Sequence, residues 1–142
     1  MSSISDIPVQ MEAAPAATDN TMVAAVVQEI IQLLDHYLGS GECGAIDIRS
    51  LPLSPDGHRQ LQQTLGRGEI RASAELGGDS EVYETAYAGV WWITHRNQDG
   101  SIIAEQLEVT AIPAILCSHH EDIQQARKRL DEMTSLYGTT DS

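Results

Sequence analysis

Cationic side chains are scarce in this sequence. Its 142 residues include 8 Lys and Arg against 21 Asp and Glu, which gives a formal net charge of −13 at pH 7. Surfaces that bind nucleic-acid phosphates or anionic lipids need clustered cations. We therefore expect neither a nucleic acid nor a membrane as a partner, and we interpret most of the acidic excess as dispersed surface charge that favours solubility.

Cysteine and long apolar runs are also scarce. Cys43 and Cys117 stand far apart with no C-x-x-C spacing, so neither a disulfide framework nor a zinc ribbon is indicated. The N-terminus has no basic region followed by an apolar run, and polar residues such as Gln28 and Glu29 interrupt the longest apolar stretch. The pattern predicts a reduced, cytoplasmic protein without an export signal or a membrane span.

Motifs of catalysis are missing as well. The glycines at 66–68 and 77–78 lack the spacing of phosphate-binding loops, and no nucleophile elbow is present. Glu84 with His95 or Glu108 would supply an acid and a base only if the side chains converged. We expect no enzymatic activity, no catalytic residue and no cofactor. Surface solvation is the expected role of four other polar residues, Asp47, Asp56, His36 and His58.

The length suits one domain, which at this size can build a core without disulfides. Residues 1–19 are rich in Ser, Ala, Pro and acidic residues without periodicity, and they predict a disordered tail. Residues 20–138 are predicted to form a single α+β domain, and residues 139–142 a second tail.

An amphipathic helix is expected after Asp19-Asn20-Thr21, which are residue types that cap helix starts, and it stops at Gly39. Its apolar residues recur at helical spacing: Val23, Val26, Val27, Ile30, Ile31, Leu34, Tyr37 and Leu38. The breadth of this stripe indicates a helix that packs on the core.

Two more helices follow the same rules. Ser54-Pro55 predicts a capped start for a helix that ends near Gly66 and has Leu61 and Leu65 as its main anchors. Ser118 to Glu121 has the pattern of a capping box. The apolar residues of this last helix are Ile123, Ala126, Leu130, Met133 and Tyr137.

Strand patterns lie between the helices. Residues 45–49 form a short alternating run of open placement, and residues 69–76 alternate as a half-buried strand. A third strand is expected over 81–96, and Asp99-Gly100 predicts a two-residue type I′ turn into a strand over 102–109. The expected fold is therefore α+β, an antiparallel β-meander with N- and C-terminal helices packed on one face.

Trp91 and Trp92 are adjacent in the third strand, so their side chains point to opposite faces. The two-residue turn sets the register: Val90 with Val109, Trp91 with Glu108, Trp92 with Leu107 and Ile93 with Gln106. Trp92 is thereby assigned to the core and Trp91 to the opposite face. A bulge at Ala88-Gly89 is expected, because it would bring Tyr83, Tyr87, Val90 and Trp92 to the core face.

The face opposite the core carries the candidate partner-binding residues. They are Glu84, Trp91, Ile93, His95, Gln106 and Glu108. An exposed Trp beside Ile is typical of interface centres. The alternatives are that the protein's own second helix, its N-terminal arm or a second copy in a homodimer covers this face.

Several short motifs occur together in order: Gly66-Arg-Gly-Glu69, Glu84-Thr85, Gly89-Val-Trp91, Asp99-Gly100, Glu108-Val109 and Ile112-Pro113. As a set they resemble the C-terminal conserved region of the HupH/HyaF-type hydrogenase expression/formation family, over roughly residues 60–117. Two departures are the shorter chain, since family members are often longer, and Trp92, where a basic residue is expected more often.

The resemblance implies an accessory, chaperone-like protein in [NiFe] hydrogenase maturation. Its partner would be a hydrogenase subunit precursor or other maturation proteins. The alternative is a metal or iron–sulfur carrier that uses Cys117 with His119 and His120, and Cys43 as a remote thiol. No metal site is expected, because adjacent histidines at a helix start diverge and structural zinc needs four converging ligands.

Overall fold

The chain is divided into two compact units in the computed structural model, which describes residues 2–75 and 77–138 and the side chains from residue 18 onward. One unit is Met1–Ala111 and the other is Ile112–Ser142. The domain predicted over 20–138 is thus divided after residue 111. Leu76 and the predicted tail 139–142 lie outside the described residues.

The first unit begins with a long helix, α1 (Ser2–Ser40). Residues 2–19, which were predicted to be a disordered tail, are part of this helix in the structure, and the helix continues through the start expected at Asp19. Asp19 is buried, and its carboxylate accepts hydrogen bonds from the amide and the hydroxyl of Ser54. A residue type that commonly caps helices here makes a tertiary contact instead.

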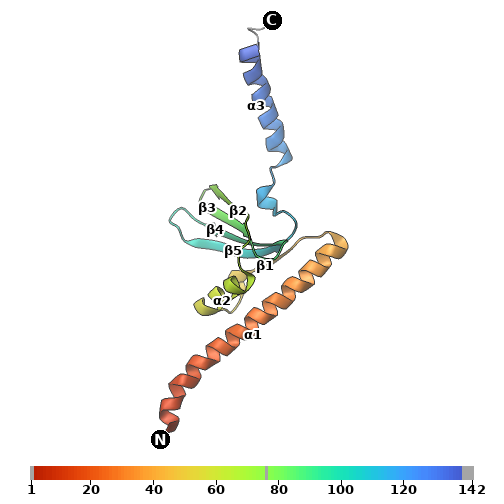
Figure 1. Ribbon diagram of the computed structural model, residues 1–142. Helices are drawn as coiled ribbons and strands as arrows, with labels where there is room; N and C mark the ends of the chain where they lie inside the picture. Colours follow the sequence, from red (N-terminus) through yellow and green to blue (C-terminus); the bar gives the residue numbers. More distant parts are fainter. Residues whose placement is uncertain (1, 76, 139–142) are drawn as a thin grey trace. The chain divides into compact units, whose positions relative to one another are not determined.

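Five strands form one antiparallel sheet in the order β1-β5-β4-β3-β2 (Figure 1). They are β1 (Gly44–Asp47), β2 (Arg71–Glu75), β3 (Asp79–Glu84), β4 (Val90–Arg96) and β5 (Ile102–Val109). Strands β2 to β5 form an antiparallel meander with one strand more than predicted, and β1 pairs with β5 at one edge. The predicted strand 45–49 is cut short because the Asp47 carboxylate accepts the amide of Arg49 and starts a 3-10 turn, Ile48–Ser50.

Helices α1 and α2 (Pro55–Leu65) cover one face of this sheet (Figure 1). The start and end of α2 are as predicted: the Ser54 hydroxyl accepts the amide of Gly57 at 3.1 Å, and Gly66 terminates the helix. The core draws on α1, β1, α2 and the sheet: Val23, Val26, Ile30, Ile46, Ile48, Leu61, Leu65, Tyr83, Val90, Trp92, Leu107 and Val109.

The segment predicted as a single strand over 81–96 is a hairpin. Strands β3 and β4 pair antiparallel across a turn at 85–89, in which Gly89 has φ 85°. The predicted bulge is therefore wrong, although Tyr83 does share the core face with Trp92, its direct partner across the hairpin. Tyr87 is exposed, because it lies in the turn.

The register between β4 and β5 is the predicted one: Val90 with Val109, Trp91 with Glu108, Trp92 with Leu107 and Ile93 with Gln106. The turn itself differs. The Asn97 amide donates to the Ser101 carbonyl at 2.9 Å, which makes the loop one residue longer than expected, with Gly100 at φ 90°. A register shift between His95 and Arg96 offsets that residue.

The second unit contains a 3-10 turn, Ala114–Leu116, and α3 (His120–Gly138). None of the residues of α3 is buried, and five of its large apolar side chains are exposed: Ile123, Leu130, Met133, Leu136 and Tyr137. The α+β class is confirmed, whereas packing of this last helix on the sheet stays a prediction. Among the described residues, no helix has both the length and the apolarity to cross a bilayer.

Candidate functional site

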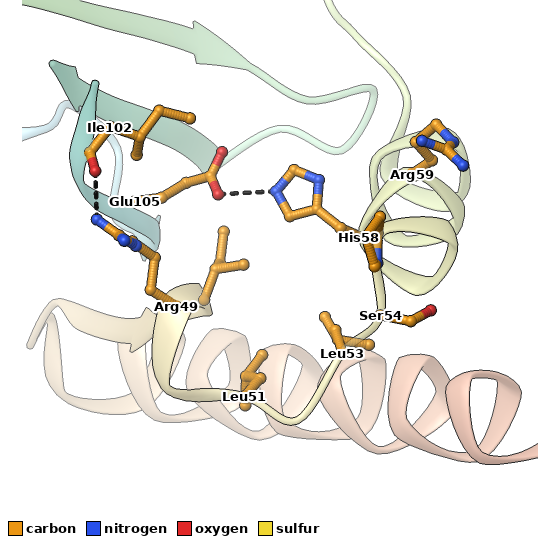
Figure 2. Close-up of a pocket in the computed structure, with 10 residues that line it drawn as sticks. Arg49, Leu51, Leu53, Ser54, His58, Arg59, Ile102 and Glu105 are labelled. Carbon is orange, nitrogen blue, oxygen red and sulfur yellow. Dashed lines mark hydrogen bonds and ion pairs between the residues drawn. The ribbon is translucent and has the colours of Figure 1, made fainter. Parts of the chain in front are cut away.

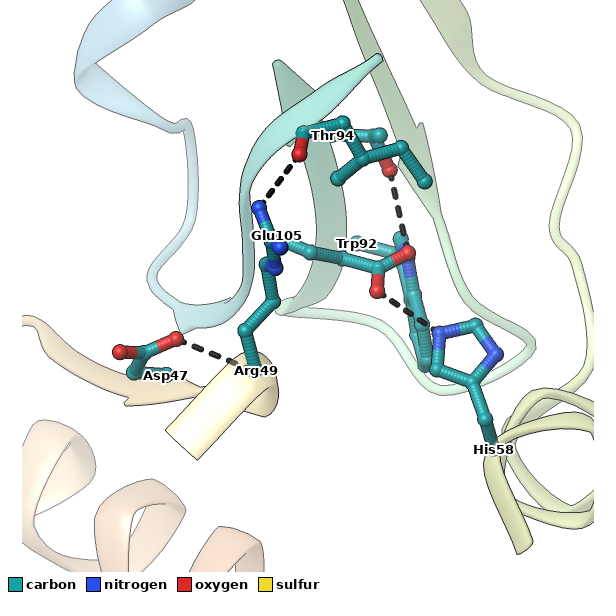
Figure 3. Close-up of polar contacts among 7 residues, drawn as sticks. Asp47, Arg49, His58, Trp92, Thr94 and Glu105 are labelled. Carbon is teal, nitrogen blue, oxygen red and sulfur yellow. Dashed lines mark hydrogen bonds and ion pairs between the residues drawn. The ribbon is translucent and has the colours of Figure 1, made fainter. Parts of the chain in front are cut away.

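A buried carboxylate lies on the helix-covered face of the sheet. Glu105 on β5 is 6% exposed, because strand alternation places it with Leu107 and Val109. Its Oε1 lies 2.7 Å from Nε2 of His58 on α2, and its Oε2 accepts the indole N–H of Trp92 at 3.0 Å (Figure 3). Such hydrogen bonds replace water around a buried charge.

Trp92 connects this carboxylate to two aromatic neighbours. The His58 ring meets the indole edge-on at 5.4 Å between centroids, and the Tyr83 ring stacks parallel to it at 6.3 Å. The Arg67 guanidinium lies 4.2 Å from the centroid of Tyr83. Burial raises the pKa of the Tyr83 phenol, and the positive charge of Arg67 opposes that shift.

A cavity of about 450 Å³ opens beside the Glu105–His58 pair (Figure 2). Two of its cationic side chains have partners of their own: Arg49 donates to the carbonyl of Ile102, and Arg59 pairs with Asp56. The lining residues are Ile48, Arg49, Leu51, Leu53, Ser54, Pro55, His58, Arg59, Ile102 and Glu105.

A histidine held by a carboxylate is also how enzymes orient a general base, which then needs a nucleophile or a reacting proton within reach. The hydroxyl in this lining, on Ser54, instead donates to Asp19 and accepts the amide of Gly57. The contacts of Glu105 give it a structural role, because they join α2 to β4 through His58 and Trp92.

The expectation that His58 is a solvated surface residue is wrong. The predicted register could have identified Glu105 as a core residue, because Glu105 lies two positions from Leu107 and therefore on the same face of β5. A charged residue at a core position needs a partner. Nothing in the local pattern of α2 indicates that His58 is that partner.

The six predicted partner-binding residues do share the opposite face of the sheet. Strand pairing places Glu84 beside Trp91 and Trp91 beside Glu108, with Ile93 beside Gln106. Trp91 and Ile93 are, however, 4% and 1% exposed, and the indole N–H of Trp91 donates to the Thr110 carbonyl at 3.0 Å. The two apolar residues therefore offer no surface to a partner in this structure.

The four polar members of that face are half-buried. Their hydrogen bonds do not join Glu84 to His95 or to Glu108. The Glu84 carboxylate accepts the Gly89 amide, His95 bonds the Ser80 hydroxyl at 2.7 Å, and the Gln106 amide donates to Glu108. The acid–base combinations of Glu84 with His95 or Glu108 are thus not assembled.

Both cysteines are free and exposed. The Cys43 thiol lies 3.2 Å from the Thr110 hydroxyl, and the Cys117 thiol lies 3.7 Å from the Pro113 carbonyl. Over residues 2–75 and 77–138, no group of three or more His, Cys, Asp or Glu side chains is arranged to hold a metal ion. The geometry of the described residues does not favour the carrier alternative.

Known proteins resemble this chain in sequence and in structure. It is 34% identical over 89 residues to hydrogenase expression/formation protein HoxQ of Azotobacter vinelandii, an alignment that covers 63% of this chain and 31% of HoxQ. It is 27% identical over 133 residues to HupH of Rhizobium leguminosarum bv. viciae, covering 94% of this chain and 47% of that protein. These alignments thus span about a third to about a half of the length of the relatives.

A solved structure, hydrogenase expression protein HupH from Thiobacillus denitrificans, superimposes with a TM-score of 0.78 at 35% identity. The match covers 80% of this chain and 94% of that one, so the α+β architecture is shared. The conserved pattern described as "HupH hydrogenase expression protein, C-terminal conserved region" matches residues 21–137. The chain therefore belongs to the HupH hydrogenase expression protein family, through its C-terminal conserved region.

Proposed function

We propose that this chain is a non-catalytic accessory protein of [NiFe] hydrogenase maturation that binds a hydrogenase subunit precursor or another assembly protein in the cytoplasm. The observation that carries the proposal is the family match over residues 21–137. The relatives are named hydrogenase expression/formation proteins, and the chain corresponds to a part of them. Fold alone would not support a function, because one fold hosts many.

The face around Trp91 is the recognition surface that we propose. Its polar members Glu84, His95, Gln106 and Glu108 are half-buried over a buried Trp91 and Ile93. Carboxylates around an apolar centre suit a partner that presents cations, since complementary charge guides encounter and fixes orientation. Trp91 then contributes by holding the face in shape through its bond to Thr110.

The test is affinity capture with the tagged full chain from cells that make an [NiFe] hydrogenase. Glu108→Arg reverses a charge on the proposed face, and we expect it to reduce capture of hydrogenase precursors at least about tenfold, the usual scale for misplacing a charge at an interface. Glu29→Arg makes the same charge change on an exposed position of α1 and should leave capture unchanged.

Two outcomes would contradict the proposal. Failure of the unmodified chain to capture any hydrogenase or maturation protein would contradict the proposed function. Equal capture by the Glu108→Arg and Glu29→Arg proteins would contradict the proposed recognition surface. Circular dichroism of each variant shows that a loss of capture is not a loss of fold.

A further inference from the structure

Strand β2 is an edge strand of the sheet, and no further strand pairs with it among residues 2–75 and 77–138. It is the last strand in the order β1-β5-β4-β3-β2, and its side chains alternate between exposed and half-buried. The exposed positions are Arg71, Ser73 and Glu75. A free edge presents unpaired backbone groups to any further strand, and proteins usually block it or use it.

The direction of those backbone groups follows from two hydrogen bonds. The Glu84 amide donates to the Ile70 carbonyl at 3.0 Å, so Ile70 faces β3, and residues 72 and 74 do so too by alternation. On the other side of β3, the Thr85 amide donates to the Val90 carbonyl at 2.9 Å, so Thr85 faces β4. Alternation along the chain then turns its neighbour Glu84 toward β2, in agreement with the bond from Glu84 to Ile70. The N–H and C=O groups of Arg71, Ser73 and Glu75 therefore point outward.

The outward residues are symmetric in charge about Ser73. Arg71 precedes it by two positions and Glu75 follows it by two. In an antiparallel pair of β2 with a second β2 centred on Ser73, Arg71 of each copy lies opposite Glu75 of the other, on the same face of the sheet. Within the described residues, neither Arg71 nor Glu75 takes part in an ion pair.

We propose that two copies of this chain associate through β2, antiparallel about Ser73, which joins their sheets into one. Three conditions meet at the same three residues: exposed side chains, outward backbone groups and a self-complementary charge pattern. The interface is isologous, as a twofold dimer requires. The opposite edge does not meet the charge condition, because β1 has the sequence Gly-Ala-Ile-Asp with a single charge.

The experiment is sedimentation equilibrium of the full chain from micromolar to millimolar concentration, at low and high salt. The unmodified chain should dimerise, and more weakly at high salt because the charge pairs are exposed. Arg71→Glu places two carboxylates opposite each other at both ends of the interface, and Glu75→Arg places two guanidinium groups there. Each should weaken dimerisation at least about tenfold.

Mixing the two variants gives the decisive measurement. In a dimer of one Arg71→Glu chain and one Glu75→Arg chain, both cross-strand pairs again join opposite charges, so the mixture should recover the affinity of the unmodified chain. Glu29→Arg is the matched control, because it changes the charge as much as Glu75→Arg does on an exposed position of α1. It should dimerise like the unmodified chain.

Three results would overturn the proposal. They are a chain that remains monomeric at millimolar concentration, a dimer that both reversals leave intact, and single variants that stay monomeric when mixed. The first includes the case in which another protein, and not a second copy, takes the β2 edge. Thermal unfolding of each variant shows whether a loss of dimer reflects a loss of fold.

Discussion

Glu105 is a buried carboxylate that connects three elements on the helix-covered face of the sheet. A carboxylate that is 6% exposed would be strongly destabilising without partners. His58 and Trp92 each donate to a different oxygen, so α2 and β4 are held to β5 by one charged group. Losing a partner costs more than the hydrogen bond itself contributes, because the buried charge remains.

His58→Ala is therefore expected to lower the free energy of unfolding by about 2 kcal/mol, less than for a fully enclosed pair because Trp92 still holds the other oxygen. His36→Ala removes an exposed histidine whose partner, Glu42, is also exposed, and it should change stability by less than about 0.5 kcal/mol. Urea denaturation followed by tryptophan fluorescence measures both. Equal effects would mean that the Glu105–His58 contact stabilises nothing.

Tyr83 makes the free energy of unfolding depend on pH in the alkaline range. Its pKa is raised above the model-peptide value of 10.0, chiefly by burial, so the folded state holds the phenolic proton more tightly than the unfolded state. The contribution is complete below pH 10 and is lost as pH rises through the raised pKa. Urea midpoints across that range should fall less steeply for Tyr83→Phe than for Tyr87→Phe, which alters an exposed ring.

Helix ends that are set by neighbouring residues could be predicted from the sequence, whereas the turn that divides a long strand-like run could not. Ser54 and Gly66 terminate α2 as expected, because caps are read from neighbouring residues. The hairpin of β3 and β4 was missed, because Thr85 to Gly89 contain one glycine in an otherwise strand-like run. The turn is also held by a contact that spacing does not predict, in which the Gly89 amide donates to the Glu84 carboxylate.

Any side chain at Gly89 is expected to destabilise the fold. Its φ is 85°, and a Cβ there would meet its nearest atom at an ordinary 3.7 Å, so the penalty comes from the backbone and not from a clash. Gly89→Ala is expected to destabilise the fold by about 1–2 kcal/mol. Gly39→Ala, inside α1 with open space around it, should stabilise by about 0.5–1 kcal/mol. Thermal unfolding that showed the same sign for both would contradict this account.

At the scale of the molecule, the division after Ala111 was not visible in the sequence. The helical spacing of apolar residues in α3 predicts a packed face, yet Leu130 and Met133 are 62% and 53% exposed. Periodicity identifies a face without identifying what covers it. For α1 the same reasoning succeeds, because Val23, Val26 and Ile30 do enter the core.

This difference predicts unequal costs for the same substitution. Leu61→Ala removes a side chain that is 0% exposed and should lower the free energy of unfolding by about 2–5 kcal/mol. Leu130→Ala changes an exposed side chain of α3 and should cost less than about 0.5 kcal/mol. Tryptophan fluorescence follows the transition, since both Trp residues lie on β4. A large cost at Leu130 would show that α3 has a buried contact.

The shift between His95 and Arg96 has a consequence for sequence change. The shift leaves Ile103 without a partner on β4, so removing Ile103 alone would leave a regular ladder in which Trp92 still pairs with Leu107. A residue removed from β5 beyond Ala104 would instead slide the rest of the strand by one position and turn its side chains to the other face of the sheet. Single-residue deletions in this hairpin should therefore be tolerated at Ile103 and not between Ala104 and Val109.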